Sequence, residues 1–147
     1  MQYNTQPIYN LLQVQITVTN NAAGGKFYFP DLPQLRDAKI YGIVYQPANL
    51  LSKDVNNVNL VTIADTSSCY LTLYSGNKEA IQQLPLVKLI SYGQNATAGN
   101  TFASADGIFN LNNLIIDFSK SFVQLGAGVS LTTTLPASFM FSIYYIK

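Results

Sequence analysis

The clearest indication of the fold is the segment Leu12-Gln-Val-Gln-Ile-Thr-Val-Thr19, which alternates apolar and neutral polar side chains. In an extended chain, successive side chains point to opposite faces. The four apolar side chains would therefore share one face, and the Gln and Thr side chains would share the other. This pattern is typical of a β-strand that is buried on one side only.

The same period of two recurs along most of the chain. The segments that carry it are rich in Val, Ile, Thr and aromatic residues, which favour strands, and they are bounded by Gly, Pro or Asn. Gly76-Asn77 predicts a hairpin turn, and Asp31 to Asp37 is expected to form one helical turn or a loop. The predicted strands are Leu12–Thr19, Lys26–Phe29, Lys39–Gln46, Leu60–Ala64, Cys69–Tyr74, Ala80–Leu84, Leu86–Tyr92 (a short strand or edge), Leu111–Phe118, Ser121–Leu125 and Ser138–Ile146.

These strands predict one sandwich-like domain. A length of 147 residues suits a single domain, and no amphipathic helix of useful length interrupts the strands. Several connections are too long for tight hairpins, which favours Greek-key crossings. We therefore expect an all-β protein, an antiparallel β-sandwich with a single jelly roll of about eight strands. Residues 1–11 are assigned to an N-terminal arm and residues 12–147 to the jelly-roll domain.

The composition removes most catalytic side chains. The chain has no His, no Trp and a single Cys, and its seven carboxylates are scattered, most of them over predicted turns. General acid–base catalysis usually relies on His or on paired carboxylates, and zinc sites rely on His and Cys. We expect no enzymatic activity, no cofactor and no resident metal. A carboxylate dyad, or a calcium ion held by loop Asp and Asn residues, stays an open alternative.

Three further classes of function are not expected. Eight basic and seven acidic residues form no like-charge run, so nucleic-acid binding is not predicted. The uncharged stretch from Ser121 to Ile146 is interrupted by Gly, Thr and Pro, so no membrane span is predicted, and the N-terminus does not resemble a cleaved leader. Cys69 lies in an apolar run and is interpreted as a small buried hydrophobic residue.

The surface chemistry indicates association with other proteins. Fourteen Asn, ten Gln, eleven Ser and eleven Thr make up nearly a third of the chain, whereas only 10% of residues are charged. Neutral polar groups can be covered by a partner without the cost of burying charge. Low charge with a net charge near zero also promotes association. We therefore expect self-assembly.

Six residues are candidates for a subunit interface. Three lie in the N-terminal arm, which is either an arm that reaches a neighbour or a frayed terminus, and two are apolar residues in a polar loop. Asp117 is an acidic residue in an apolar strand, and it either faces solvent or pairs with a Lys across a subunit contact. The candidates are Tyr3, Ile8, Tyr9, Leu50, Leu51 and Asp117.

A polar arm before Leu12–Thr19, strands joined by Asn- and Gly-rich loops, and the aromatic closing segment SFMFSIYYIK resemble one family over nearly the whole chain. This is the family of single jelly-roll capsid proteins of icosahedral viruses, particularly penton or minor capsid proteins of tailless bacteriophages. The resemblance implies a subunit that is made in the host cytoplasm and located in the virion. It would assemble as a pentamer or trimer and would contact other capsid proteins. The basic arm that many capsid proteins use for the genome is missing.

Two alternatives remain at this point. A jelly roll can be a carbohydrate-binding module, with exposed Tyr and loop Asn or Asp residues on the sugar. Trimeric domains of the tumour-necrosis-factor or complement C1q kind also have a similar length and aromatic closing strands.

Overall fold

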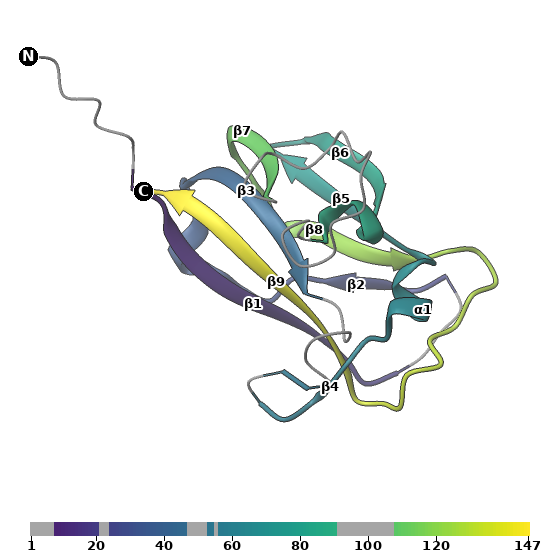
Figure 1. Cartoon of the computed structure of the whole chain (residues 1–147). Helices are drawn as coiled ribbons and strands as arrows, with labels where there is room; N and C mark the ends of the chain where they lie inside the picture. The colour runs from purple at the N-terminus through teal and green to yellow at the C-terminus, as the bar shows by residue number, and fades with distance from the viewer. Residues whose placement is uncertain (1–7, 21–23, 47–52, 55, 91–107) are drawn as a thin grey trace, which may run out of the picture.

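The computed structural model describes residues 8–20, 24–46, 53–54, 56–90 and 108–147, which form two sheets packed face to face (Figure 1). The first sheet has the strand order β1-β9-β3-β7, with the two-residue β4 beside β9. The second has the order β2-β8-β5-β6. The strands are β1 (Asn10–Val18), β2 (Lys26–Tyr28), β3 (Lys39–Gln46), β4 (Asn59–Leu60), β5 (Cys69–Ser75), β6 (Lys78–Pro85), β7 (Phe109–Ile115), β8 (Asp117–Leu125) and β9 (Ala137–Ile146).

Neighbouring strands are antiparallel except for β4, which runs parallel to β9. The all-β sandwich predicted from the sequence is therefore confirmed. The chain changes sheet between most successive strands, whereas β5 and β6 form a hairpin within the second sheet. As a result, β1 and β9, the first and last strands, lie side by side (Figure 1).

The alternation in the first strand has the predicted result. Val14, Ile16 and Val18 are buried, whereas Gln13 and Thr17 are exposed. The strand begins two residues earlier than the pattern indicates, because Asn10 pairs with Tyr145 and the next residue pairs with Tyr144. The last residues assigned to the arm are thus part of the sheet.

The core lies between the two sheets and is built from their inward-facing side chains. Aromatic residues from three strands meet at its centre: the Phe141 ring lies 5.3 Å from the rings of both Phe29 and Tyr45, measured between centroids. Phe29, which follows β2, also meets Phe118 of β8 edge to face. Large rings bury much apolar surface, so this cluster joins the two sheets. Other fully buried core residues are Leu35, Ile40, Ile43, Leu71, Leu73, Leu86, Leu89, Leu125, Phe139 and Ile143.

Two predicted strands are helical instead. In the predicted strand Leu60–Ala64, the extended chain ends at Leu60 and the helix α1 (Ile63–Thr66) follows. The helix begins here because the Thr62 side chain caps it, accepting a hydrogen bond from the backbone N–H of Asp65. In Leu86–Tyr92, the first four residues form a 3₁₀ helix, η2 (Leu86–Leu89), which buries Leu86 and Leu89 on one side. The expected helical turn after β2 is observed as η1 (Pro33–Leu35).

The boundary between the predicted strands Leu111–Phe118 and Ser121–Leu125 is also wrong. The prediction separates them at Ser119-Lys120, but those residues lie inside β8. The break is at Ile116, the single residue between β7 in the first sheet and β8 in the second. The Ile116 side chain is buried in the core, so its packing fixes the position at which the chain passes from one sheet to the other.

Candidate functional site

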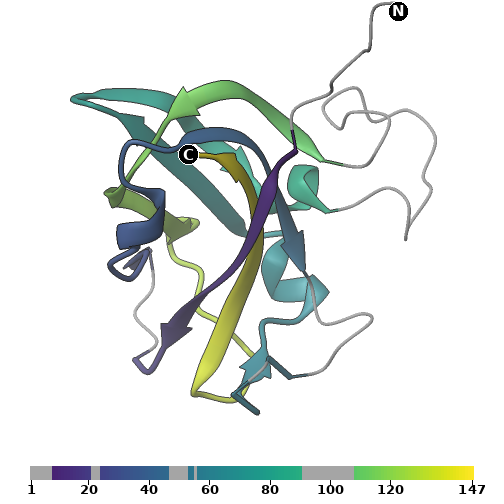
Figure 2. The ribbon, with the colours of Figure 1, turned by 90° about the vertical axis from the view of Figure 1, so that its left-hand side faces the viewer.

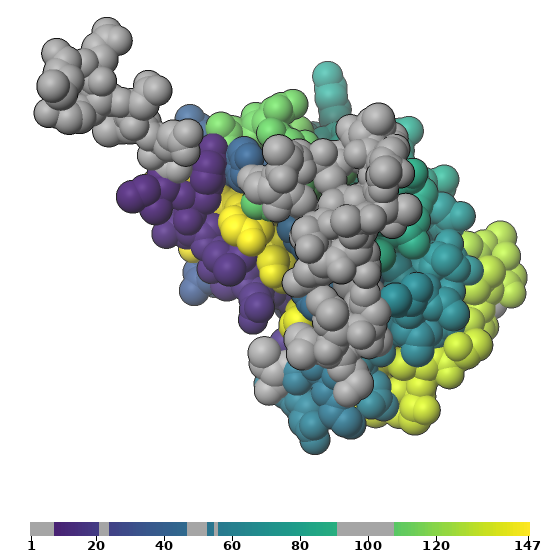
Figure 3. Space-filling view, in the orientation of Figure 1, coloured from purple at the N-terminus to yellow at the C-terminus, as the bar shows by residue number. Residues whose placement is uncertain are grey.

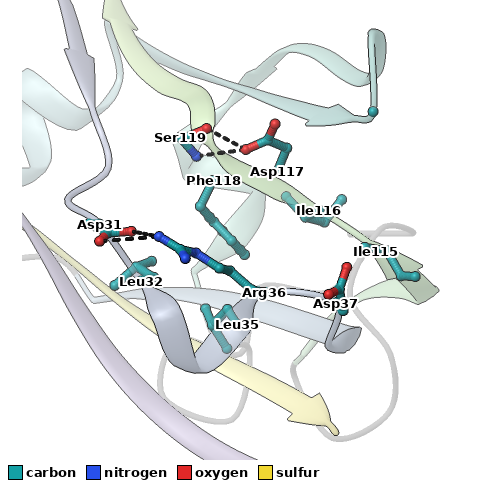
Figure 4. Close-up of a pocket in the computed structure, with 11 residues that line it drawn as sticks. Asp31, Leu32, Leu35, Arg36, Asp37, Ile115, Ile116, Asp117, Phe118 and Ser119 are labelled. Atoms are coloured by element: carbon teal, nitrogen blue, oxygen red, sulfur yellow. Dashed lines mark hydrogen bonds and ion pairs between the residues drawn. The ribbon is translucent and has the colours of Figure 1, made fainter.

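One cleft of about 380 Å³ lies at the β7–β8 corner of the sandwich (Figure 4). One wall is the connection around η1, the other is the corner itself, and Gly76 of the β5–β6 turn completes the lining. Leu35, Ile116 and Phe118 contribute an apolar floor that belongs to the core. The full lining is Asp31, Leu32, Leu35, Arg36, Asp37, Gly76, Ile115, Ile116, Asp117, Phe118 and Ser119.

Arg36 is the cationic residue of this cleft, and its guanidinium is bound to Asp31. The Nη2 atom donates to Asp31 Oδ1 at 3.2 Å. Both side chains are exposed, at 69% and 74%, so water screens the pair and its contribution to stability is about 0–1 kcal/mol. Figure 4 shows Asp31 and Asp37 at opposite ends of the cleft with Arg36 between them.

Asp117 begins β8 on the opposite wall, and its carboxylate is occupied by its own strand. Its Oδ1 accepts hydrogen bonds from the backbone N–H of Ser119 at 3.1 Å and from the Ser119 hydroxyl at 2.5 Å. Its Oδ2 lies 3.9 Å from the Lys120 ammonium, which also donates to Asn77 Oδ1 at 2.8 Å. Asp117 therefore stabilises the start of β8 and faces a Lys of its own chain. The predicted contact with a Lys of another subunit stays a prediction.

The cleft offers limited chemistry. Asp31 and Asp117 are each engaged with a neighbour, and Asp37 lies apart from Asp31. No group of three or more Asp, Glu, Cys or His side chains that could hold a metal ion is found among the residues that the structure describes. Phe118, the aromatic lining residue, is only 5% exposed and is not available for stacking on a ligand. The rim of the cleft therefore carries three carboxylates, those of Asp31, Asp37 and Asp117, and the Arg36 guanidinium.

A second polar cluster, centred on Asp65 of α1, is structural. The carboxylate is 6% exposed and accepts hydrogen bonds from both the backbone N–H and the hydroxyl groups of Thr132 and Thr133. The shortest joins the Thr133 hydroxyl to Asp65 Oδ2 at 2.6 Å. Burial opposes ionisation of this carboxyl group, but the hydrogen bonds from Thr133 and Thr132 outweigh it and hold the pKa below its usual value.

Cys69 and Tyr45 lie beside this cluster, in the core. Cys69 is fully buried, as the sequence predicts, and its Sγ donates to the Asp65 carbonyl oxygen at 3.2 Å. Burial raises the pKa of the thiol to about 12, so a nucleophilic thiolate is strongly disfavoured. The Tyr45 hydroxyl lies 3.2 Å from Thr66 Oγ1. Since the Thr66 hydroxyl donates to the Thr62 carbonyl, Tyr45 is the donor, and burial raises the pKa of Tyr45 as well.

The interface candidates that the structure describes lie in two places. Ile8 is 89% exposed just before β1, and the neighbouring Tyr9 ring stacks on Tyr41 with a centroid distance of 4.1 Å. Asp117 belongs to the other sheet. Tyr3, Leu50 and Leu51 lie outside the described residues.

Sequence reasoning missed the exposed pair Leu114 and Ile115 at the end of β7, which are 39% and 48% exposed. Strict alternation would bury one of two successive apolar residues. Here the chain leaves the first sheet at Ile116, so both side chains remain at the surface. The signal in the sequence that could have indicated this exposed pair is the run of three consecutive apolar residues before Asp117, because a strand with strict alternation would not place apolar residues at successive positions.

No helix within the described ranges is long and apolar enough to cross a membrane. Comparison with protein-family models, curated proteins and solved structures finds no match to this chain.

Proposed function

We propose that the chain is a structural subunit of an icosahedral virus particle, a penton or minor capsid protein. It assembles with copies of itself, as a pentamer or trimer, and docks to other capsid proteins. The observation that carries the proposal is the strand order, β1-β9-β3-β7 in one sheet and β2-β8-β5-β6 in the other. Two interlocked Greek keys, as in a single jelly roll, would generate an interleaved order of this kind, so the strand order supports the proposal.

Fold alone does not determine function, because jelly rolls serve as capsid subunits and as lectins. The surface supports assembly. Large apolar side chains are exposed on β1, β2, α1 and β7 rather than gathered in one ligand-sized cavity. Each can become an anchor when a neighbouring subunit covers it. The exposed set is Ile8, Leu11, Tyr28, Ile63, Leu114 and Ile115.

The polar groups support the same proposal. The buried carboxylate of Asp65 binds the backbone N–H groups of Thr132 and Thr133, and the carboxylates of Asp31 and Asp117 pair with basic residues of their own chain. These charges are used within the subunit. The remaining surface of amide and hydroxyl groups can be covered by a neighbour at low desolvation cost. Complementary shape, rather than charge, would then hold the assembly together.

The direct test is the mass and shape of the purified full-length protein. Light scattering after size exclusion should give a mass of several chains, and electron microscopy should show closed rings or particles. A monomer of 16.1 kDa at high protein concentration would contradict the proposal. Binding of the same monomer to a glycan array would favour a lectin-like role instead.

A further inference from the structure

The two sheets have four outer edges, formed by β1, β7, β2 and β6. The outer edge of a sheet exposes unpaired backbone N–H and C=O groups, which can pair with a strand of another molecule. Proteins normally prevent this with charges, prolines, bulges or very short edge strands. The four edges can therefore be compared by the protection that each carries.

Three of the four edges are protected. β7 is bulged, because Asn112 and Asn113 have positive φ angles and the pairing with β3 shifts register at this point. β6 carries Lys78, Glu79 and Pro85, together with a register shift of its own. β2 is only three residues long and begins with a lysine. Each feature interrupts the regular, uncharged ladder that a foreign strand needs.

β1 has none of these features. It is nine residues long, and its pairing with β9 runs from Asn10–Tyr145 to Val18–Ala137 without a register shift. The sequence from Ile8 to Gly25 contains no charged residue and no proline. In an antiparallel pair, part of the backbone N–H and C=O groups of each strand point away from the partner. Within the described ranges, no backbone hydrogen bond reaches these outward groups of β1.

The outer edge of β1 lies at the surface of the molecule. In Figure 2, β1 lies in front of β9, and no other labelled or coloured strand lies between it and the viewer. In the space-filling view, the atoms of β1 form the left-hand rim of the molecule (Figure 3). The outer edge of β1 is therefore accessible to an approaching strand.

We propose that the outer edge of β1 pairs with β1 of a second copy of this chain, antiparallel and across a two-fold axis at Val14. The first sheets of the two copies then join into one continuous sheet. The contact is isologous, since the same strand is used on both sides. The β1–β1 contact depends on the proposed function only for its role in a virus particle. If the subunits form rings of three or five copies, this contact would link one ring to another.

The register follows from the pleat. Opposite residues in an antiparallel pair point to the same face, so an even sum of residue numbers keeps the buried faces of both copies together. Full overlap of Asn10–Val18 with its own copy gives the sum 10 + 18 = 28, which is even. Val14 then faces Val14, Leu12 faces Ile16 and Gln13 faces Gln15. The sequence Leu-Gln-Val-Gln-Ile is thus symmetric in character about the axis.

The absence of charged residues from β1 favours a second copy of this chain as the partner strand. Near a two-fold axis, a charged side chain lies close to the same charge of the partner, which is destabilising. β1 contains no charged residue, and the Gln13–Gln15 pairs can form neutral hydrogen bonds in either direction. A strand selected for a charged partner would carry the complementary charge.

The test uses two double variants with charges at the same two positions. In Gln13→Lys/Gln15→Lys, the proposed register places lysines opposite each other twice. In Gln13→Glu/Gln15→Lys (the Lys/Glu variant), it places a lysine opposite a glutamate twice. Both variants lose the same intrachain hydrogen bond, from Asn56 Nδ2 to Gln15 Oε1 at 2.9 Å, so this loss cancels.

We expect the wild-type protein to have a mass corresponding to an even number of chains in light scattering. The Lys/Lys variant should fall to half that mass or less, and the Lys/Glu variant should keep it. Hydrogen exchange provides a second measurement: the amides of β1 should become protected as the protein concentration rises, in the wild type and the Lys/Glu variant only. Equal masses for the two variants, or a monomeric wild type, would overturn the proposal.

The results distinguish failure of the β1 pairing from failure of the proposed capsid function. If the Lys/Lys variant keeps its mass and electron microscopy still shows rings, assembly stands and β1 pairing is wrong. If the mass halves in the predicted pattern but no ring or particle is seen, β1 pairing stands and the capsid role is wrong.

Discussion

Asp65 and Asp54 are buried to nearly the same degree, 6% and 8% exposed, but the structure uses them differently. Asp65 accepts hydrogen bonds at both oxygens from residues 67 and 68 positions away in the sequence. Asp54 accepts two at Oδ1, from the backbone N–H groups of Asn56 and Val58, and its Oδ2 is buried without a partner among the described residues. The first carboxylate joins distant segments, whereas the second shapes a single turn.

The difference shows that burial does not by itself reveal how much a polar group contributes. A buried carboxylate stabilises the fold only as far as its oxygens are paired, because each unpaired oxygen still carries its desolvation cost. Asp65 is paired completely and Asp54 is paired by half. Four substitutions and one matched control test this difference between the two carboxylates.

The largest effect is expected for Asp65→Ala. The backbone N–H groups of Thr132 and Thr133 would lose their acceptor, and the β8–β9 connection would keep only the hydrogen bond from the Thr62 N–H to Thr133 Oγ1 near α1. Because hydrogen bonds to charged groups are the strong ones, we expect a loss of about 3 kcal/mol in the free energy of unfolding. Urea unfolding followed by fluorescence measures it. A loss below about 1 kcal/mol would show that the cluster is not stabilising.

A smaller loss, about 2 kcal/mol near neutral pH, is expected for Asp65→Asn, because the amide keeps one acceptor but turns an N–H₂ group towards N–H donors. This loss should depend on pH. The pKa of Asp65 is lowered in the folded protein, so its contribution is complete above the unfolded pKa of about 3.9 and disappears as pH falls through the folded pKa.

Unfolding midpoints of the wild type and Asp65→Asn, measured from pH 7 to pH 2, should therefore converge at the acid end. A constant difference over this range would contradict the assignment. Protonation of the other carboxylates affects both proteins and cancels in the comparison.

Thr133→Val should cost about 1.5 kcal/mol, because the hydroxyl both donates to Asp65 and accepts from the backbone N–H of Thr62 at 3.1 Å. Thr132→Val is the matched control. Its hydroxyl only donates to Asp65, at 2.8 Å, so we expect less than half that cost. Equal costs in thermal unfolding would remove the special role of Thr133.

The smallest effect is expected for Asp54→Asn, within about 0.5 kcal/mol of the wild type. The amide oxygen can keep both bonds of the turn, and the N–H₂ group replaces a buried oxygen that has no partner. A loss as large as that of Asp65→Asn would show that the ionised group at position 54 has a partner of its own.

The sequence predicted much of the fold because alternation is a local signal. The predicted bounds of β1, β3, β5 and β9 lie within one or two residues of the observed ones. Burial alternates along β1, whereas β3, β5 and β9 bury consecutive residues and are indicated by their content of β-branched and aromatic side chains. α1 was missed because Ile63 and Ala64 continue the apolar pattern of β4, and only the capping Thr62 marks the change. The corner at Ile116 was missed because Leu114, Ile115 and Phe118 are apolar whichever sheet they join.

The polar contacts were less predictable for a physical reason. Asp65 was interpreted from its neighbours in sequence as a turn residue, but its partners are Thr132 and Thr133 on another connection. No local pattern contains that information. The same limit applies to the cleft, in which Arg36 and Asp117 come together only because η1 packs beside the β7–β8 corner.

The position of β9 has a consequence for synthesis. The ribosome makes β9 after all the other described strands, yet β9 lies between β1 and β3 and also pairs with β4. The nascent chain therefore holds three strands without their central partner until β9 has emerged. The first sheet cannot be completed before β9 is made, and a chain interrupted before Ala137 would leave the edges of β1 and β3 open to aggregation.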